Sequence, residues 1–229
     1  MCKESDTTAS RVIAIAGGAG KLGAAIARRL AIAGHRVVIG SRDADKARDV
    51  AARMAQENNC VVDGDSNAAA AARGDIVILA VPYASRRQLL EEIRDTVAGK
   101  IVVDTTVPLQ PPKVMRVQLP AAGSAALETQ ALLGESVKVV AAFHNVAAHK
   151  LATDEEIDCD ILVFGDDKSA RSTVIDLVHA CRLRGLHGGA LANSAAAEAL
   201  TSVLIFINKT YGVDGAGVRI TGNLQAVGG

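Results

Sequence analysis

A glycine-rich turn between an apolar run and a helical pattern is the feature that most restricts the fold of this chain. The segment Gly18-Ala-Gly-Lys-Leu-Gly23 follows the apolar residues 11–16 and precedes apolar residues at helical spacing. In a strand-turn-helix context the first glycine permits a tight turn, the second admits a pyrophosphate, and the third lets the helix pack closely. The helix N-terminus then offers N–H groups and a positive dipole to the anion. The expected dinucleotide contacts are Gly18, Ala19, Gly20, Lys21, Leu22 and Gly23.

The alternation of strand and helix continues along most of the chain. Further strands are expected at 36–40, 75–81, 100–104, 137–142 and 160–164, and helices at 43–58, 67–73, 85–97, 124–134 and 168–184. Strands separated by helices of about 10–15 residues build βαβ units and a mostly parallel sheet. We therefore expect an α/β fold with a Rossmann-type doubly wound sheet. The expected divisions are a flexible N-terminus at 1–10, the dinucleotide-binding domain at 11–192, and a small C-terminal helical extension of the same unit at 193–229.

The end of the second expected strand indicates which dinucleotide binds. An NAD site usually carries a carboxylate there to hold the ribose 2′-hydroxyl. This chain has Gly40-Ser-Arg42 instead, so Arg42 can pair with a 2′-phosphate and Ser41 can donate a hydroxyl. Lys46 lies about one helical turn further and can add a second cation. The prediction is NADP(H) rather than NAD(H).

The carboxyl ends of the later strands should complete the binding edge, because ligands of such sheets bind there. Ala80, Val81 and Pro82 can lie along a nicotinamide ring, and Thr105 can hydrogen-bond its carboxamide. His144 follows the strand at 137–142 and is the candidate catalytic residue, as a hydrogen-bond donor to a substrate carbonyl or as an acid.

Composition argues against two other kinds of partner. The chain has 25 basic and 25 acidic residues, so no basic patch for nucleic acid is expected. It shows no apolar signal segment and no continuous apolar run of about 18 residues, so no membrane partner is expected. Its four cysteines have no metal-ligand spacing, which predicts free thiols, no metal site and a cytoplasmic location.

Six segments in a fixed order resemble the F420H2:NADP+ oxidoreductases, and the likeness runs from Val12 to about Gly222. They are Ile15-Ala-Gly-Gly-Ala-Gly-Lys-Leu-Gly23, Gly40-Ser-Arg42, Leu79-Ala-Val-Pro82, Val139-Val-Ala-Ala-Phe-His-Asn145, Val163-Phe-Gly-Asp-Asp167 and Leu191-Ala-Asn-Ser194. The resemblance implies a homodimer that transfers a hydride directly between NADP(H) and the deazaflavin coenzyme F420. Ser41 and Arg42 match positions that hold the 2′-phosphate. His144, Asn145 and Val146 match the region that lines the deazaflavin pocket.

Two other functions remain open on the residues alone. One is an NADPH-dependent reductase of a small carbonyl or imine compound on the same scaffold, with His144 as proton donor. The other is a non-enzymatic NADP(H) sensor. An acceptor pocket beside the nicotinamide would favour an enzyme over a sensor.

Overall fold

Eight strands form a single sheet in the computed structural model, which describes residues 11–224. The expected flexible segment 1–10 and the last part of the extension, 225–229, lie outside the described residues. The strands are β1 (Val12–Ala16), β2 (Arg36–Ser41), β3 (Val62–Ser66), β4 (Ile76–Leu79), β5 (Ile101–Asp104), β6 (Lys138–Ala141), β7 (Asp160–Phe164) and β8 (Arg184–Gly189). The helices are α1 (Lys21–Ile32), α2 (Ala44–Asn58), α3 (Asn67–Arg73), α4 (Tyr83–Ile93), α5 (Ala125–Leu133), α6 (Ala148–Leu151), α7 (Lys168–Ala180) and α8 (Ser194–Tyr211).

The strand order is β3-β2-β1-β4-β5-β6-β7-β8. Every neighbouring pair is parallel except β6 and β7, which are antiparallel. The order reverses beside β1, where the chain leaves one half of the sheet to build the other. The expected Rossmann-type, mostly parallel sheet is therefore confirmed.

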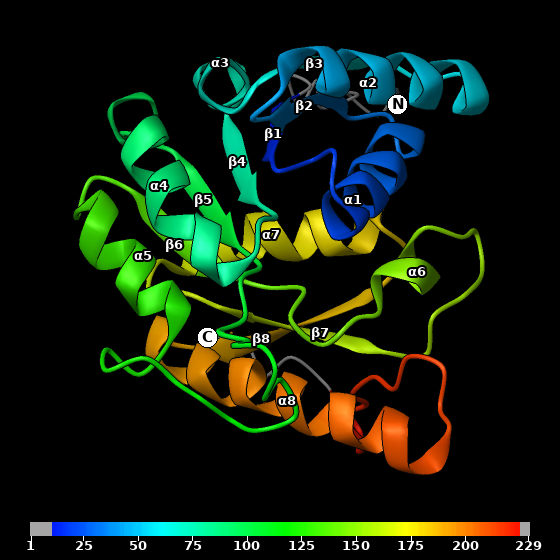
Figure 1. Cartoon of the computed structure of the whole chain (residues 1–229), viewed down its shortest axis with the longest axis vertical. Coiled ribbons are helices and arrows are strands. Elements are labelled where there is room, and N and C mark those ends of the chain that lie inside the picture. Colours follow the sequence, from blue (N-terminus) through cyan, green and yellow to red (C-terminus); the bar gives the residue numbers. More distant parts are fainter. Residues whose placement is uncertain (1–10, 225–229) are drawn as a thin grey trace, which may run out of the picture.

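Two hydrophobic cores lie on opposite faces of the sheet. One contains the buried faces of α1, α2 and α7, and the other contains those of α3, α4 and α5 together with Ala197 of α8. Figure 1 shows α4 and α5 on one side of the strands, α1 on the other side, and α8 across the lower end. The central strands are apolar throughout because both of their faces are covered.

Two edge strands depart from the sequence-based expectation. β3 reads Val62-Asp-Gly-Asp-Ser66, which is the composition of a turn, and it pairs only with β2. β8 occupies residues at the end of the expected helix 168–184 and in the glycines after it, and it pairs only with β7. An edge strand pairs with one neighbour only and needs no continuous apolar run. The sequence of such a strand therefore predicts its presence only weakly.

The expected C-terminal extension is built around α8. By length and composition the segment Leu191–Tyr211 is sufficient to cross a membrane. In the fold Ala197, Glu198, Ser202 and Leu204 of this helix are buried against the protein.

Candidate functional site

The carboxyl ends of five parallel strands lie at one level of the sheet. Ala16 of β1 pairs in register with Gly40 of β2 and with Leu79 of β4. Leu79 pairs in turn with Asp104 of β5, and Asp104 pairs with Ala141 of β6. The residues that follow these five positions therefore share one edge of the sheet, as the sequence predicts for a ligand-binding edge.

The turn after β1 depends on four glycines with little free space around them. Gly17 has a positive φ of 79°, and a Cβ on it would lie 2.5 Å from Val81 Cγ1 and 2.6 Å from the Ala80 carbonyl oxygen. A Cβ on Gly18 would lie 2.7 Å from the carbonyl oxygen of Ile15, and one on Gly23 would lie 2.7 Å from the Cα of Gly18. The tight turn thus needs Gly17 for its φ angle and Gly18 for its lack of a side chain.

Gly20 ends the turn and begins α1 without a side-chain cap. The helices α2, α3, α5 and α7 each begin with an Asp or Ser side chain that accepts a backbone N–H, whereas α4, α6 and α8 lack such a cap, as α1 does. A Cβ on Gly20 would lie 3.2 Å from the carbonyl oxygen of Gly17, a close contact that the glycine avoids. The first turn of α1 is therefore open to an anion at the ligand edge.

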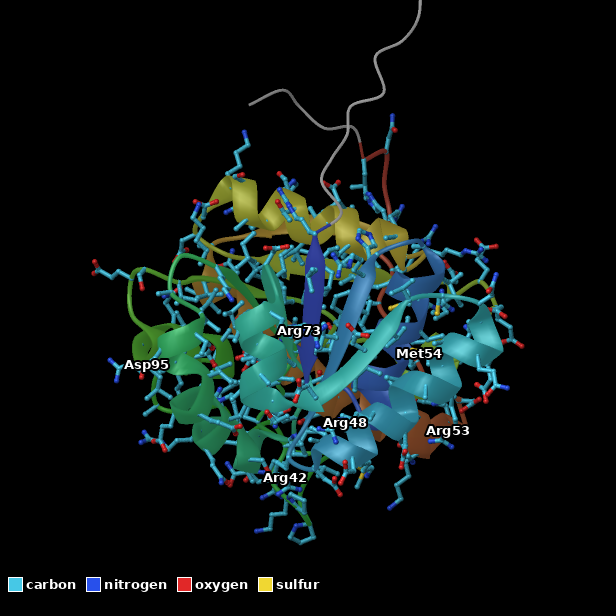
Figure 2. All side chains as sticks on the ribbon, turned by 90° about the horizontal axis from the view of Figure 1, so that it is seen from above. Arg42, Arg48, Arg53, Met54, Arg73 and Asp95 are labelled. Carbon is cyan, nitrogen blue, oxygen red and sulfur yellow. The ribbon has the colours of Figure 1, made fainter. Side chains whose placement is uncertain are left out.

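Two cations stand at the end of β2 and the start of α2. Arg42 and Lys46 are exposed, and among residues 11–224 neither pairs with a carboxylate. The Asp43 carboxylate beside Arg42 accepts the backbone N–H of Lys46 at 3.1 Å and so caps α2. Figure 2 shows Arg42 at the rim of the molecule. The two cations are therefore available to a phosphate.

A cleft of about 240 Å³ joins the glycine turn to these cations. Its lining includes eight of the expected cofactor contacts, which are Ala19, Gly20, Ser41, Arg42, Lys46, Ala80, Val81 and Pro82. Gly18, Lys21, Leu22, Gly23 and Thr105 are not among its lining residues. Gly18 and Gly23 shape the turn from within, and Leu22 packs against the core. The Thr105 hydroxyl donates to the Leu79 carbonyl oxygen at 2.8 Å, which joins β5 to β4 beneath the edge.

Asn67 is a cleft residue that the sequence did not reveal. It is buried at the start of α3, and its Oδ1 accepts the backbone N–H of Gly17 at 3.0 Å. It thereby holds the glycine turn from the side of β3. Its position directly after a strand would have drawn attention to it, but that strand is β3, whose turn-like composition conceals it. We call Gly17–Gly20, Ser41, Arg42, Lys46 and Asn67 the nucleotide end of the site.

His144 lies further along the same edge, after β6. Two strand spacings separate β6 from β4, which is about 10 Å, and His144 does not line the cleft. Its side chain is buried, with 6% of the residue exposed, and within residues 11–224 neither ring nitrogen has a hydrogen-bond partner. Burial lowers the pKa of His144 to about 4, against the opposing field of the Asp104 carboxylate. The imidazole is therefore neutral at pH 7 and can donate one hydrogen bond and accept another.

Further buried polar groups lie at the end of the neighbouring strand β5. The Thr106 hydroxyl is also buried without a partner in the described part of the chain. Asp104 is fully buried, and its carboxylate accepts the Thr106 N–H at 2.8 Å and the Thr129 hydroxyl at 2.6 Å. Unpaired buried polar atoms are costly and point to a missing ligand or water. We call Asp104, Thr106 and His144 the acceptor end of the site.

The turn that carries His144 is held from α8. Phe143 adopts a φ of 64°, which is uncommon for a residue with a side chain and is found at functional turns. The Asn145 side-chain amide donates to the Ala197 carbonyl oxygen at 2.9 Å and to the Thr201 hydroxyl at 3.1 Å. Thr201 donates to the carbonyl oxygen of His144 at 3.1 Å. The amide of Asn145 thus fixes the turn, while Val146 packs into the core beneath it.

The arrangement fits a dinucleotide followed by a second ligand. Among residues 11–224, the nucleotide end supplies an uncapped helix N-terminus and two cations without a carboxylate partner. The acceptor end supplies a neutral imidazole and a hydroxyl without hydrogen-bond partners, next to the buried Asp104 carboxylate. Among residues 11–224 no group of His, Cys, Asp and Glu has the arrangement of a metal site.

Known proteins with similar sequences and structures point to one family. Residues 12–108 match the family model described as NADP oxidoreductase, coenzyme F420-dependent. An F420-dependent NADP reductase of Methanocaldococcus jannaschii is 40% identical over 93% of this chain and 99% of its own length. One from Methanothermobacter thermautotrophicus is 36% identical over 91% and 94%. The crystal structure of a putative F420-dependent NADP reductase from Arthrobacter sp. FB24 superposes with a TM-score of 0.79 at 25% identity, covering 92% of this chain and 99% of that one.

Proposed function

The chain belongs to the F420-dependent NADP oxidoreductases, and we propose that it transfers a hydride between NADP(H) and coenzyme F420 along the edge from the nucleotide end to the acceptor end. It is an NADP-dependent oxidoreductase, with NADP and F420 as its pair of reactants. The residue assignment rests on the different groups found at the two ends of the carboxyl edge of the sheet. Within residues 11–224, one end has two cations without a carboxylate partner beside an uncapped helix, and the other has a buried imidazole without a hydrogen-bond partner.

The nucleotide end holds NADP(H) in this proposal. The first turn of α1 and the glycine turn receive the pyrophosphate, and Arg42, Lys46 and Ser41 receive the 2′-phosphate. Ala80, Val81 and Pro82 continue the cleft toward β5 and form the apolar support for the nicotinamide ring. Thr105 stabilises the edge of the sheet indirectly, because its hydroxyl hydrogen-bonds β5 to β4.

The acceptor end orients the deazaflavin. The neutral His144 and the Thr106 hydroxyl supply hydrogen bonds to its polar ring edge, and Val146 and the Asn145 turn support them. Because burial lowers the pKa of His144 to about 4, the proposal assigns it hydrogen bonding at neutral pH rather than proton donation from an imidazolium.

Direct hydride transfer needs two rings held face to face more than it needs a protein nucleophile. With both reactants bound, the hydride passes between C4 of the nicotinamide and C5 of the deazaflavin. The residues of this chain bind, orient and exclude water, which accords with a site built from backbone turns, neutral polar groups and apolar walls.

The decisive experiment mixes the purified protein with NADPH and oxidised F420 and follows the visible absorbance of the deazaflavin. We expect the deazaflavin to be bleached as NADPH is consumed. A protein that binds NADPH tightly but reduces neither F420 nor a panel of carbonyl and imine compounds would contradict the proposal and favour a sensor. Turnover of an imine without turnover of F420 would favour the small-substrate reductase.

We also propose that the protein is a homodimer formed through α8. Val203 and Phe206 of this helix are 42% and 53% exposed. The Ser202 hydroxyl joins α8 to the loop of Arg116, which exposes a further set of apolar side chains, Met115, Val117 and Leu119. Phe206→Asp should convert a dimer to a monomer in sedimentation measurements. Val61→Asp is the matched control, because Val61 is 65% exposed beside the distant edge strand β3. A monomeric wild-type protein would contradict the dimer.

The thiol state of the described cysteines fits a protein that works in a reducing compartment. Cys60, Cys159 and Cys181 are free thiols, and Cys159 and Cys181 are buried. We propose that the protein works in the cytoplasm, where thiols stay reduced. Fractionation of the native host with a cytoplasmic marker enzyme tests this, and recovery with the membranes would contradict it.

A further inference from the structure

A buried carboxylate on α8 accepts hydrogen bonds from the first two backbone amides of α5. The Glu198 carboxylate is 1% exposed, and it accepts the N–H of Ala125 at 2.7 Å and the N–H of Ala126 at 3.2 Å. The Ser194 hydroxyl lies 3.4 Å from the same carboxylate and donates to the Ser124 hydroxyl at 2.9 Å. Among residues 11–224 Glu198 forms no ion pair.

The start of α5 is otherwise held by local groups. Ser124 accepts the Leu127 N–H with its hydroxyl at 3.1 Å and the Glu128 N–H with its carbonyl at 3.3 Å. The first four amides of a helix have no partner within the helix. In α5 the first two of them depend on Glu198, a residue more than seventy positions later in the sequence.

α5 in turn holds the acceptor end. Thr129, one turn after the amides that Glu198 binds, donates to Asp104 at 2.6 Å. Asp104 also accepts the Thr106 N–H, and its carbonyl oxygen accepts the N–H of Ala142, two residues before His144. One turn from Glu198 along α8, Thr201 holds the His144 carbonyl oxygen directly. Glu198 therefore holds the start of α5, which contacts Asp104, while Thr201 on the same helix holds the His144 turn.

We propose that Glu198 is a positioning residue for the hydride transfer, and that its ionised carboxylate fixes the start of α5 so that Asp104, Thr106 and His144 keep the arrangement that receives the deazaflavin. This rests on the proposed function for the identity of the acceptor. The nucleotide end is built from other contacts, so the role of Glu198 concerns the acceptor and not NADP(H).

The protonation state of Glu198 changes near neutral pH. Burial raises the pKa of its carboxyl to about 7, against the two backbone hydrogen bonds that favour the charged form. The charged groups that act on this carboxyl are Asp104 of β5, which raises its pKa, and Arg86 of α4, which lowers it. The charge of Glu198 in turn raises the pKa of the Tyr83 phenol on α4. Arg86 is itself paired with Glu128, so it does not neutralise Glu198. A protonated carboxyl accepts hydrogen bonds more weakly than a carboxylate, so acidification loosens the start of α5.

The first test compares the pH dependence of turnover in wild type and Glu198→Gln. The glutamine keeps the shape and one acceptor but cannot ionise. In wild type we expect kcat/KM for F420 to rise by about 3-fold or more between about pH 6 and 8, as Glu198 ionises. The variant should lack this step, and its Kd for NADPH should stay within about 2-fold of wild type because the nucleotide end is untouched.

Ser202→Ala is the matched control on the same helix. Ser202 is buried, and within the described part of the chain its hydroxyl forms one side-chain hydrogen bond, to the Arg116 carbonyl oxygen, so this variant should keep the wild-type pH profile. A Glu198→Gln enzyme with the wild-type profile would overturn the proposal. So would a variant that loses NADPH affinity in parallel with F420 turnover, because that indicates general damage to the fold.

The second test needs no variant and no F420. In the full-length wild-type protein the amide proton shifts of Ala125 and Ala126 should titrate together with a midpoint near the pKa of Glu198, about 7. Flat amide shifts across that pH range would overturn the proposal even if F420 is reduced. If the two amide shifts titrate but Glu198→Gln keeps the wild-type pH profile of kcat/KM for F420, Glu198 only caps α5. That result would also overturn the proposal. Failure of F420 reduction with titrating amides would instead count against the proposed function.

Discussion

The nucleotide end and the acceptor end share one sheet edge but are built by different means. The nucleotide end is open, and its chemistry comes from backbone turns and exposed cations such as Arg42 and Lys46. The acceptor end is buried, and its polar groups come from β5, β6, α5 and α8. Asp104 and His144 have no ion-pair partner among residues 11–224, whereas the cleft cations face water.

This difference predicts two kinds of response to mutation. At the nucleotide end a substitution changes binding of a charged ligand and costs little stability, unless it strikes the glycine turn. At the acceptor end a substitution changes the stability and the pH response of the protein as well, because the groups are already desolvated. Substitutions at the two ends should therefore separate ligand binding from stability and pH response.

The largest effect is expected from Gly17→Ala. The new Cβ would lie 2.5 Å from Val81 Cγ1 and 2.6 Å from the Ala80 carbonyl oxygen, at a φ of 79°. The free variant relieves this overpacking and backbone strain by leaving the conformation that binds the dinucleotide, and returning to it costs about 3 kcal/mol, so NADPH affinity should fall by about 100-fold or more. Isothermal titration with NADPH measures it.

Gly34→Ala is the matched control for Gly17→Ala. Gly34 has a φ of 92°, but nothing lies within 4 Å of a Cβ built on it. This variant should lose about 1 kcal/mol of stability from the φ strain and keep the wild-type affinity. Equal loss of NADPH binding in both variants would mean that backbone strain, and not contact with Ala80 and Val81, governs the turn.

Arg42→Ala should have the next largest effect. A charge-assisted hydrogen bond contributes about 1.5–3 kcal/mol, so the preference for NADPH over NADH should fall by about 10- to 100-fold, with little change in the Kd for NADH. Arg48→Ala is the control, since Arg48 lies on α2 but pairs with Asp45 and does not line the cleft (Figure 2). Wild-type protein with equal affinities for NADPH and NADH would contradict the 2′-phosphate assignment.

The two ends also differ in how far the sequence predicts them. Gly18-Ala-Gly-Lys-Leu-Gly23 and Ser41-Arg42 are local signals, because each motif lies within one strand-to-helix connection. The structure adds that Gly17, which precedes the motif, adopts the positive φ of the turn, and that Asp43 caps α2. Asn67 escaped prediction because β3 is an edge strand with the composition of a turn.

The acceptor end could be predicted only in part, because its contacts join distant segments. His144 stands out since it follows a buried strand, but nothing near it in the sequence reveals that its ring nitrogens are buried without partners. Glu198 appears as one acidic residue in an apolar helix, a pattern that usually marks a solvated position. Only the docking of α8 against α5 buries it and gives it two backbone amides.

A smaller effect is expected from His144→Leu. Both ring nitrogens are buried without partners among residues 11–224, so an apolar side chain of similar size removes a desolvation cost. We expect the ligand-free protein to gain about 1 kcal/mol of stability, while kcat/KM for F420 falls and the Kd for NADPH stays unchanged. Chemical denaturation and the F420 assay measure these outcomes. A loss of stability would mean that the imidazole already has a partner, such as bound water.

The smallest effect is a pair of opposing pH slopes in the free energy of unfolding. The pKa of His144 is lowered from 6.5 to about 4 in the folded state, so its contribution is present above pH 6.5 and is lost as the pH falls toward 4. The pKa of Glu198 is raised from 4.5 to about 7, so its contribution is present below pH 4.5 and is lost as the pH rises through 7. Between these limits the two slopes oppose each other in wild type.

Relative to wild type, His144→Leu should become more stable on acidification from about pH 6.5 to 5, and Glu198→Gln less stable, each by up to about 1 kcal/mol per pH unit. Urea unfolding at the two pH values measures both slopes, and Arg42→Ala, at the exposed nucleotide end, should follow wild type. Changes of the same sign in both acceptor-end variants would show that these groups do not titrate independently, and that the buried end responds to protons as one coupled unit.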